Sequence, residues 1–265
     1  MTTYDTFPYA GEADILECRL RELEDLDIHH VIVEAAVTHR GDPKPFTFIE
    51  DEARFKPWWG RITYVRVAAS ALPSVEENPD PWSREWAQRE FCHRGLEEVP
   101  GAKPDDYVLH GDADEIPAPG ALKALEMKDL PWPAVFEMRL CQYAADWVHP
   151  EPWHGTIRTR WRSAGSFAQL RTLRNQLPTI MAGGSHLSWM GGTEAHIRKL
   201  GLHCHLEMTQ ATETALRSGE WLRTGQHSDG RKLIPVDVDE TWPRWVYERK
   251  CPESWFRPRE DEAVA

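Results

Sequence analysis

The hydrophobic and polar positions of the first 145 residues follow two alternating periods. Apolar residues at helical spacing, such as Ile15, Leu16, Leu20 and Leu23, predict an amphipathic helix. Short β-branched runs predict strands that are covered on both faces. On these signals we expect helices at 13–26, 81–99 and 118–127, and strands at 29–37, 61–69, 106–112 and 134–143. Strands that alternate with helices indicate an α/β fold with a mostly parallel sheet flanked by helices.

The second half of the chain lacks this regularity. Beyond about residue 145, Trp, Gly and Arg are frequent, and the pattern predicts loops. One further helix is expected at 192–201, with Thr193 as its cap and Gly201 as its stop. We therefore expect a single domain over 1–265, made of an ordered half (1–145), a loop-rich half that supplies the site (146–250) and a tail (251–265).

A run of carboxylates follows the strand expected at 106–112, in the segment "VLHGDADEIP" (108–117). Residues two apart in an extended segment project to the same side, so Asp112 and Asp114 point together beyond the carboxyl end of the strand. Ligands of open α/β sheets settle at that edge, and paired carboxylates suit Mg²⁺ or Mn²⁺. Glu115 points to the opposite side, where it can hold a neighbouring Arg. The alternative is an acidic surface turn in which Asp112 or Asp114 caps the next helix.

A second D-x-D pattern lies in "DVDE" at 237–240. It follows Pro235 and has no apolar strand before it, so we expect a loop or the start of a helix there. The pattern alone is therefore weak evidence for a metal site.

Charge and cysteine content narrow the setting. The chain has 31 basic and 43 acidic residues and a formal charge of −12, which disfavours non-specific binding to nucleic acid. The segment 154–174 contains several Arg and no acidic residue, so it either receives an anion or forms a solvated basic face. Five cysteines without a CxxC pair predict free thiols. With no signal peptide and no apolar run of roughly 18 residues, we expect a soluble, cytoplasmic chain.

Five separated blocks together resemble glycosyltransferase family 17. They are "FPYAGEADILECRLRELED" (7–25), "VIVEAAVTHRGDPKPFTF" (31–48), "REWAQRE" (84–90), "DDYVLHGDADEIPAPGAL" (105–122) and "GGSHLSWMGGTEAHIRKL" (183–200). The resemblance implies a GT-A-like fold, a nucleotide-sugar donor, Mn²⁺ or Mg²⁺, and inversion at the anomeric carbon. It implies donor binding by the half at 1–145 and acceptor binding by the half at 146–250. A UDP-sugar, with GlcNAc as the sugar, is the donor that the family favours.

The resemblance also suggests metal ligands. Asp114 is the expected direct ligand, and Asp112 is expected to bind the metal or the ribose of the donor. His205 is expected to complete the site, and His186 to line the substrate pocket. His203 and His186 stay open as alternative ligands.

Further roles follow from matched positions in the family. Glu194 and Asp114 are the expected catalytic residues. Glu194, in the first turn of a helix after two glycines, is the expected base. A helix N-terminus lowers the basicity of a carboxylate, so the alternative is a plain helix-opening acid. Three residues, Glu12, Glu34 and Lys44, match positions near the donor. Arg89 could reach the diphosphate or pair with Glu85 one helical turn earlier.

Two other functions fit part of the pattern. A metal-dependent phosphohydrolase or nucleotidyltransferase also needs paired carboxylates and Mg²⁺. A non-catalytic carbohydrate-binding protein could use some of the 13 Trp, whose flat faces stack on sugars. The acceptor of a transferase is a hydroxyl on a glycan, a protein, a lipid precursor or a modified nucleic acid, and the sequence does not decide among them.

Overall fold

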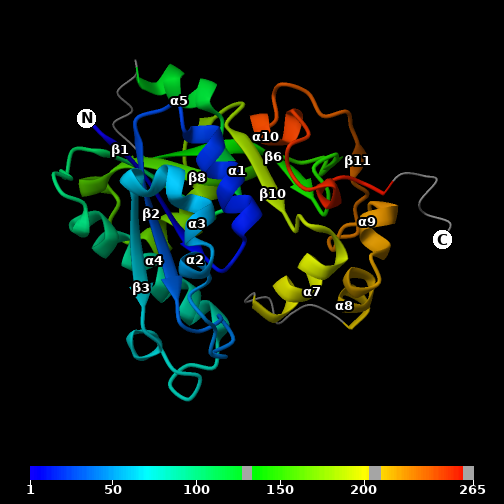
Figure 1. Ribbon diagram of the computed structural model, residues 1–265, viewed down its shortest axis with the longest axis horizontal. Coiled ribbons are helices and arrows are strands. Elements are labelled where there is room, and N and C mark those ends of the chain that lie inside the picture. The colour runs from blue at the N-terminus through cyan, green and yellow to red at the C-terminus, as the bar shows by residue number, and fades with distance from the viewer. Residues whose placement is uncertain (127–132, 203–209, 259–265) are drawn as a thin grey trace.

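Residues 1–126, 133–202 and 210–258 are described in this computed structural model of the chain (Figure 1). The strands are β1 (Thr3–Tyr9), β2 (Ile28–Ala35), β3 (Ile62–Val67), β4 (Tyr107–His110), β5 (Glu115–Pro117), β6 (Ala134–Gln142), β7 (Trp147–Val148), β8 (Trp153–Arg160), β9 (Thr179–Ile180), β10 (Gly184–Ser188) and β11 (Ile234–Pro235). The helices are α1 (Ala13–Leu23), α2 (Thr47–Glu50), α3 (Glu52–Phe55), α4 (Pro81–Glu98), α5 (Pro119–Glu126), α6 (Phe167–Leu173), α7 (Gly192–Leu202), α8 (Gln210–Arg217), α9 (Glu220–Thr224) and α10 (Arg244–Tyr247).

A single mixed sheet runs through the molecule in the order β11-β7-β6-β8-β4-β1-β2-β3. The β4, β1, β2 and β3 neighbours are parallel, and Thr6 of β1 aligns with both His110 of β4 and Val31 of β2. From β4 onward through β8 and β6 to β7 the neighbours are antiparallel. Helices cover the sheet, as Figure 1 shows, and the α/β class predicted from the sequence is confirmed.

The predicted helices and strands all occur, and the sheet also contains strands that were not expected, among them β1, β8 and β10. β1 is a central strand, between β2 and β4. β8 lies between β4 and β6, in a region where the sequence predicted loop. β10 pairs in parallel with β6 and antiparallel with β5, which directly follows the carboxylate run.

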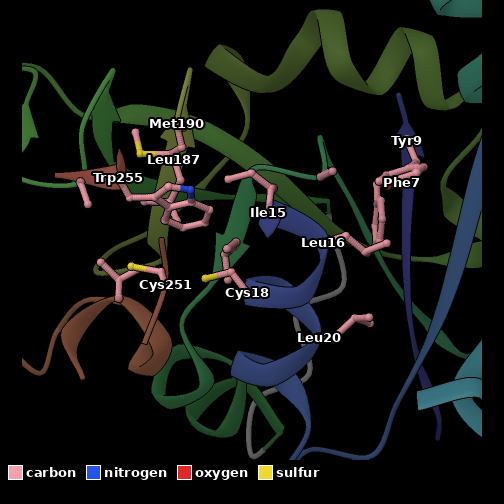
Figure 2. Close-up of a cluster of buried hydrophobic side chains, with 14 of the residues drawn as sticks. Phe7, Tyr9, Ile15, Leu16, Cys18, Leu20, Leu187, Met190, Cys251 and Trp255 are labelled. Atoms are coloured by element: carbon pink, nitrogen blue, oxygen red, sulfur yellow. The ribbon is translucent and has the colours of Figure 1, made fainter. Parts of the chain in front are cut away.

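One hydrophobic core joins the first helix to the last described residues. Figure 2 shows Ile15 and Cys18 of α1 on the side that faces Leu187, Cys251 and Trp255. Trp255 is only 1% exposed, although the sequence analysis counts it with the tail. The burial of these side chains fixes α1 against the second half of the chain, because each fully buried apolar side chain contributes about 1.5–3 kcal/mol.

A second core packs α4 on the strands β2 and β3. Its closest approach is at Gly95, where a Cβ atom would lie 2.2 Å from Cγ1 of Val31 and 2.9 Å from Cγ2 of Val65. Glycine is therefore needed for α4 to lie this close to the sheet. This packing places Arg89 of α4 near the carboxyl end of β4.

Two further findings concern expectations from composition. Four cysteines, Cys18, Cys92, Cys141 and Cys251, are buried free thiols, as predicted, and Cys204 lies outside the described residues. No helix in the described part of the chain combines the length and the apolar character that a membrane span requires.

Candidate active site

The carboxyl ends of the parallel strands bring the predicted site residues to one edge of the sheet. Glu12 follows β1 and Glu34 lies near the end of β2. The residues 111–115, here called the acidic turn, follow β4. Because β1, β2 and β4 are parallel neighbours, these carboxylates gather where α/β proteins bind ligands.

Two arginine side chains bond the carboxylate of Asp112. Arg89 donates to Oδ1 of Asp112, and Nη2 of Arg171 lies 2.5 Å from Oδ2. Burial raises the pKa of Asp112, but Arg171 and Arg89 together outweigh it and hold this pKa well below its usual range. Arg89 also bonds Glu85 at 2.5 Å, so the helical pair expected from the sequence is present, and a contact of Arg89 with the diphosphate stays a prediction.

Glu115 fixes the acidic turn from beneath. It is fully buried, and its carboxylate accepts from Arg171 at 2.5 and 2.9 Å and from Nε1 of Trp153 at 2.6 Å. It also accepts from the backbone N–H of Asp112 at 3.0 Å. Glu115 holds an Arg, as expected, but it does not point away from Asp112, because Nη2 of Arg171 lies 2.5 Å from an oxygen of each carboxylate.

Arg19 of α1 supports the backbone of the same turn. Its Nη1 donates to the carbonyl oxygens of Asp112 at 3.1 Å, Ala113 at 3.3 Å and Glu115 at 2.6 Å. Its Nε and Nη2 bond both oxygens of the buried Asp5, at 2.8 and 2.5 Å. Arg19 is itself fully buried, so its charge is balanced by Asp5 and its donors are used on the turn.

Asp114 faces a different pair of groups. Its Oδ1 lies 3.3 Å from Nε2 of His186, and its Oδ2 accepts from Nζ of Lys199 on α7 at 3.2 Å. Burial raises the pKa of Asp114, but Lys199 and His186 outweigh it and lower the net value. Burial also raises the pKa of nearby Glu12, and Asp114 adds to this effect while Lys199 opposes it. Lys199 thus balances two carboxylates. Burial lowers the pKa of Lys199, but Asp114 and Glu12 outweigh burial, so the net pKa is raised.

A divalent cation fits Asp114 better than Asp112. Both oxygens of Asp112 are already bonded to guanidinium groups, which would have to leave before a metal bound. Asp114 and His186 offer an oxygen and a nitrogen on facing groups, and Nδ1 of His186 is buried without a hydrogen-bond partner among the described residues. Carboxylate suits Mn²⁺ and Mg²⁺, and imidazole is a ligand of divalent first-row transition metals. The residues therefore fit a cation held by Asp114 and His186.

Glu34 and Lys44 contact each other. Nζ of Lys44 lies 2.7 Å from Oε1 of Glu34, which also accepts from the backbone N–H and the hydroxyl of Thr47 at 2.9 and 2.8 Å. Oε2 of Glu34 accepts from Phe48 N at 3.1 Å and from the hydroxyl of Tyr64 at 2.8 Å. The pair orders the segment that begins α2, and a donor contact by either residue remains a prediction.

Two predicted residues lie elsewhere or outside the described chain. Glu194 is exposed in the first turn of α7, after Gly191 and Gly192, which both have positive φ. His205, predicted as a metal ligand, and His203 lie outside the described residues. The structure therefore tests neither the base nor the third ligand.

The sequence analysis named none of Arg19, Arg171 and Lys199 as site residues. Arg171 lies in the segment 154–174, which has no acidic residue and was expected either to bind an anion or to form a solvated basic face. The anions that Arg171 contacts are the carboxylates of Asp112 and Glu115. Arg19 stands on the apolar face of α1, and a charge in such a position is a signal for a buried partner.

Comparison with known proteins identifies the family of the chain. The family model described as Glycosyltransferase family 17 matches residues 2–209. The chain belongs to glycosyltransferase family 17. This membership confirms the resemblance that the five blocks indicated.

Curated relatives of this family 17 chain include the human β-1,4-mannosyl-glycoprotein 4-β-N-acetylglucosaminyltransferase. It is 26% identical over 250 residues, which cover 84% of this chain and 44% of the human protein. The enzymes of that name from Rattus norvegicus and Mus musculus give 26% identity with the same coverage. The chain thus spans less than half of the length of these relatives.

Solved structures also resemble the chain, at a distance. A galactosyltransferase LgtC complex with donor and acceptor sugar analogues is 14% identical, with a TM-score of 0.35 and coverage of 66% of this chain and 64% of that one. The apo glycosyltransferase GlyE of Streptococcus pneumoniae TIGR4 is 13% identical, with a TM-score of 0.34 and coverage of 89% and 45%.

Proposed function

We propose that this chain is a metal-dependent inverting glycosyltransferase that moves a sugar from a nucleotide-sugar donor to an acceptor hydroxyl. The names of the curated relatives favour N-acetylglucosamine as the sugar, and a UDP-sugar as donor. The observation that carries the proposal is the position of Asp114. It stands at the carboxyl edge of a parallel sheet, beside His186 and Lys199, in a chain of family 17.

The residues divide the chemical work as follows. Asp114 would hold Mn²⁺ or Mg²⁺, with His186 as a second ligand that suits Mn²⁺ better than Mg²⁺, and the metal would supply a Lewis acid for the departing diphosphate. Lys199 adds positive charge at the same place, because its ammonium lies 3.2 Å from Asp114. Asp112 stays between its two arginines and keeps the turn in shape.

The base must take the proton of the acceptor hydroxyl on the face of the sugar opposite the leaving group. We keep Glu194 in this role. Its exposure at the start of α7, on the same helix as Lys199, leaves its carboxylate accessible to an acceptor. The acceptor itself is a hydroxyl of a glycan, protein, lipid precursor or modified nucleic acid, and a cytoplasmic location remains a prediction.

Donor turnover by the wild type and two matched variants tests the proposal. Purified chain is incubated with a panel of UDP- and GDP-sugars and Mn²⁺, and the release of nucleotide and of phosphate is measured separately. Asp114→Asn should lower sugar-dependent nucleotide release by about 10²–10³-fold, the usual effect of removing one stabilising group at a reacting centre. Asp237→Asn, in the exposed second D-x-D, serves as the control and should keep full activity.

Other outcomes point to the other functions. Phosphate release that does not depend on the sugar would indicate a phosphohydrolase. Sugar binding without turnover, unchanged in Asp114→Asn, would indicate a carbohydrate-binding protein. Equal nucleotide release by Asp114→Asn and Asp237→Asn would refute the assigned role of Asp114.

A further inference from the structure

Outside the acidic turn, two segments that are far apart in the sequence bring together three side chains of the kinds that bind metals. His149 directly follows β7. His227 and Asp229 stand in a short hairpin closed by the bridge between Gln226 and Lys232. One ligand atom from each of His149, His227 and Asp229 lies within 4.8 Å of the others. His149 and Asp229 are 80 positions apart.

The carboxylate of Asp229 lies between the two imidazoles. Its Oδ2 is 3.1 Å from Nε2 of His149, and its Oδ1 is 2.8 Å from Nδ1 of His227. The two rings approach edge to face, with centroids 4.9 Å apart. The turn sets this arrangement, because the N–H of His227 bonds the carbonyl of Arg231 at 2.9 Å and Gly230 adopts a φ of +87°.

The ring of His149 is fixed from both sides. Its Nδ1 accepts from the backbone N–H of Glu151 at 3.1 Å and lies 3.0 Å from the carbonyl oxygen of the same residue, while Nε2 faces the carboxylate of Asp229. When a metal replaces the proton of Nε2, Nδ1–H can donate to that carbonyl, which is the outer-shell arrangement of many metal sites. The side chain of His149 is only 6% exposed, so its orientation is fixed.

We propose that His149, His227 and Asp229 bind a transition-metal cation of the Zn²⁺ class. Two imidazole nitrogens and one carboxylate oxygen are a donor set typical of Zn²⁺ sites with one open position. Mg²⁺ and Ca²⁺ prefer all-oxygen sites, so the set discriminates against them. The site is distinct in its ligands from the one proposed at Asp114.

The cation has a path to this site. The side chain of Asp229 is 38% exposed, so solvent reaches the cluster. The nearest competing cation is Arg231, whose Nη1 lies 3.6 Å from Oδ2 of Asp229 and 2.7 Å from the carboxylate of Glu151. Arg231 is itself 46% exposed and keeps Glu151 as its partner, so it can move away from Asp229.

Metal binding here would tie together two segments that brace α7. Leu233, just after the hairpin, is 3% exposed in a cluster that also contains Trp147 of β7 and Leu200 of α7. A ligand that binds only the folded state raises the unfolding temperature. The cation therefore should stabilise the helix that carries Glu194 and Lys199.

Zinc binding by variants of the whole chain tests the proposal. Asp114→Asn is the parent, so that the proposed catalytic cation does not contribute. After removal of metals, Zn²⁺ is titrated by calorimetry into the parent and into the parent with Asp229→Asn, His227→Gln or His154→Gln. His154 is a partly exposed histidine that bonds Asn175 at 3.1 Å and serves as the matched control.

The parent and His154→Gln should bind one equivalent of Zn²⁺, show a higher unfolding temperature with it, and give visible absorption of a four-coordinate ion with Co²⁺. Asp229→Asn and His227→Gln should bind Zn²⁺ more than about 100-fold more weakly, because loss of an outer-shell partner alone costs roughly 10- to 100-fold. Circular dichroism confirms that each variant is folded. Zinc affinity that is equal in all four proteins, or absent from the parent, would overturn the proposal.

Discussion

Replacement of Arg171 by Met tests how much this buried cation stabilises the acidic turn. The guanidinium contacts Glu115 at 2.5 and 2.9 Å and Asp112 at 2.5 Å, and Glu115 is fully buried. Met retains much of the side-chain volume but leaves the charge of Glu115 without its guanidinium partner. Removing one member of a buried ion pair costs about 3–5 kcal/mol. Since domains are stable by roughly 5–15 kcal/mol, the loss is a large part of the total.

An exposed pair and a double variant isolate the electrostatic part. Arg94 and Glu98 form a pair at 3.1 Å with side chains 63% and 45% exposed, so Arg94→Met should cost less than about 1 kcal/mol. Glu115→Gln removes the charge that Arg171→Met leaves unpaired. The variant with both changes should therefore be more stable than the sum of the single effects predicts, by about 1–3 kcal/mol.

Urea unfolding, followed by tryptophan fluorescence, measures all four variants, and the 13 Trp of the chain give the signal. The comparison uses free energies of unfolding extrapolated to water, with the slope against urea checked for constancy. If Arg171→Met costs no more than Arg94→Met, or if the two effects at Arg171 and Glu115 add without coupling, the acidic turn does not depend on this buried pair.

Two further variants test titration and donor binding. Burial lowers the pKa of His196 to about 4, with the carbonyl of Trp189 acting in the opposite direction, so the unfolded chain binds protons that the folded chain does not. From pH 7 to pH 5 the wild type should therefore lose about 2 kcal/mol more unfolding free energy than His196→Gln, measured by urea at both pH values, and equal losses would contradict this. Glu34→Gln should cost about 3 kcal/mol of stability, because Glu34 is buried and paired with Lys44, while the donor KM stays unchanged. A raised KM with unchanged stability would instead support the predicted donor contact of Glu34.

Local periodicity predicted the helices α1, α4, α5 and α7 and the strands β2, β3, β4 and β6, but not the central strand β1. Buried parallel strands are recognised by nearly continuous apolar residues, and β1 instead buries Asp5 and Thr6. Asp5 is tolerated there because Arg19 and His30 bond its carboxylate. Pro8 also argues against a central strand. It is accommodated because pairing of β1 with β4 ends at Thr6, so the far end of β1 has β2 as its neighbour.

The position of the carboxylates was predictable, and the identity of their partners was not. The parallel-sheet rule places Asp112 and Asp114 at the ligand edge of the sheet. Strand parity does not apply, because residues 112–115 form a turn, and Asp112 and Asp114 have different partners. Arg171 reaches them from a helix 59 residues further along the chain, and Lys199 from a helix 85 residues beyond Asp114. Such partners depend on how distant elements pack, and no local pattern in one sequence encodes that packing.

The charges at this edge of the sheet are unevenly distributed. Three arginines, Arg89, Arg171 and Arg174, interact with Asp112 or Glu115, and Arg89 shares its charge with Glu85. Lys199 balances both Asp114 and Glu12, so negative charge is in excess around these two carboxylates. The raised pKa of Glu12 agrees with this, because Asp114 contributes to it after burial. A cation that arrives with the donor diphosphate would relieve this repulsion at Asp114, rather than at Asp112, where two guanidinium groups already stand.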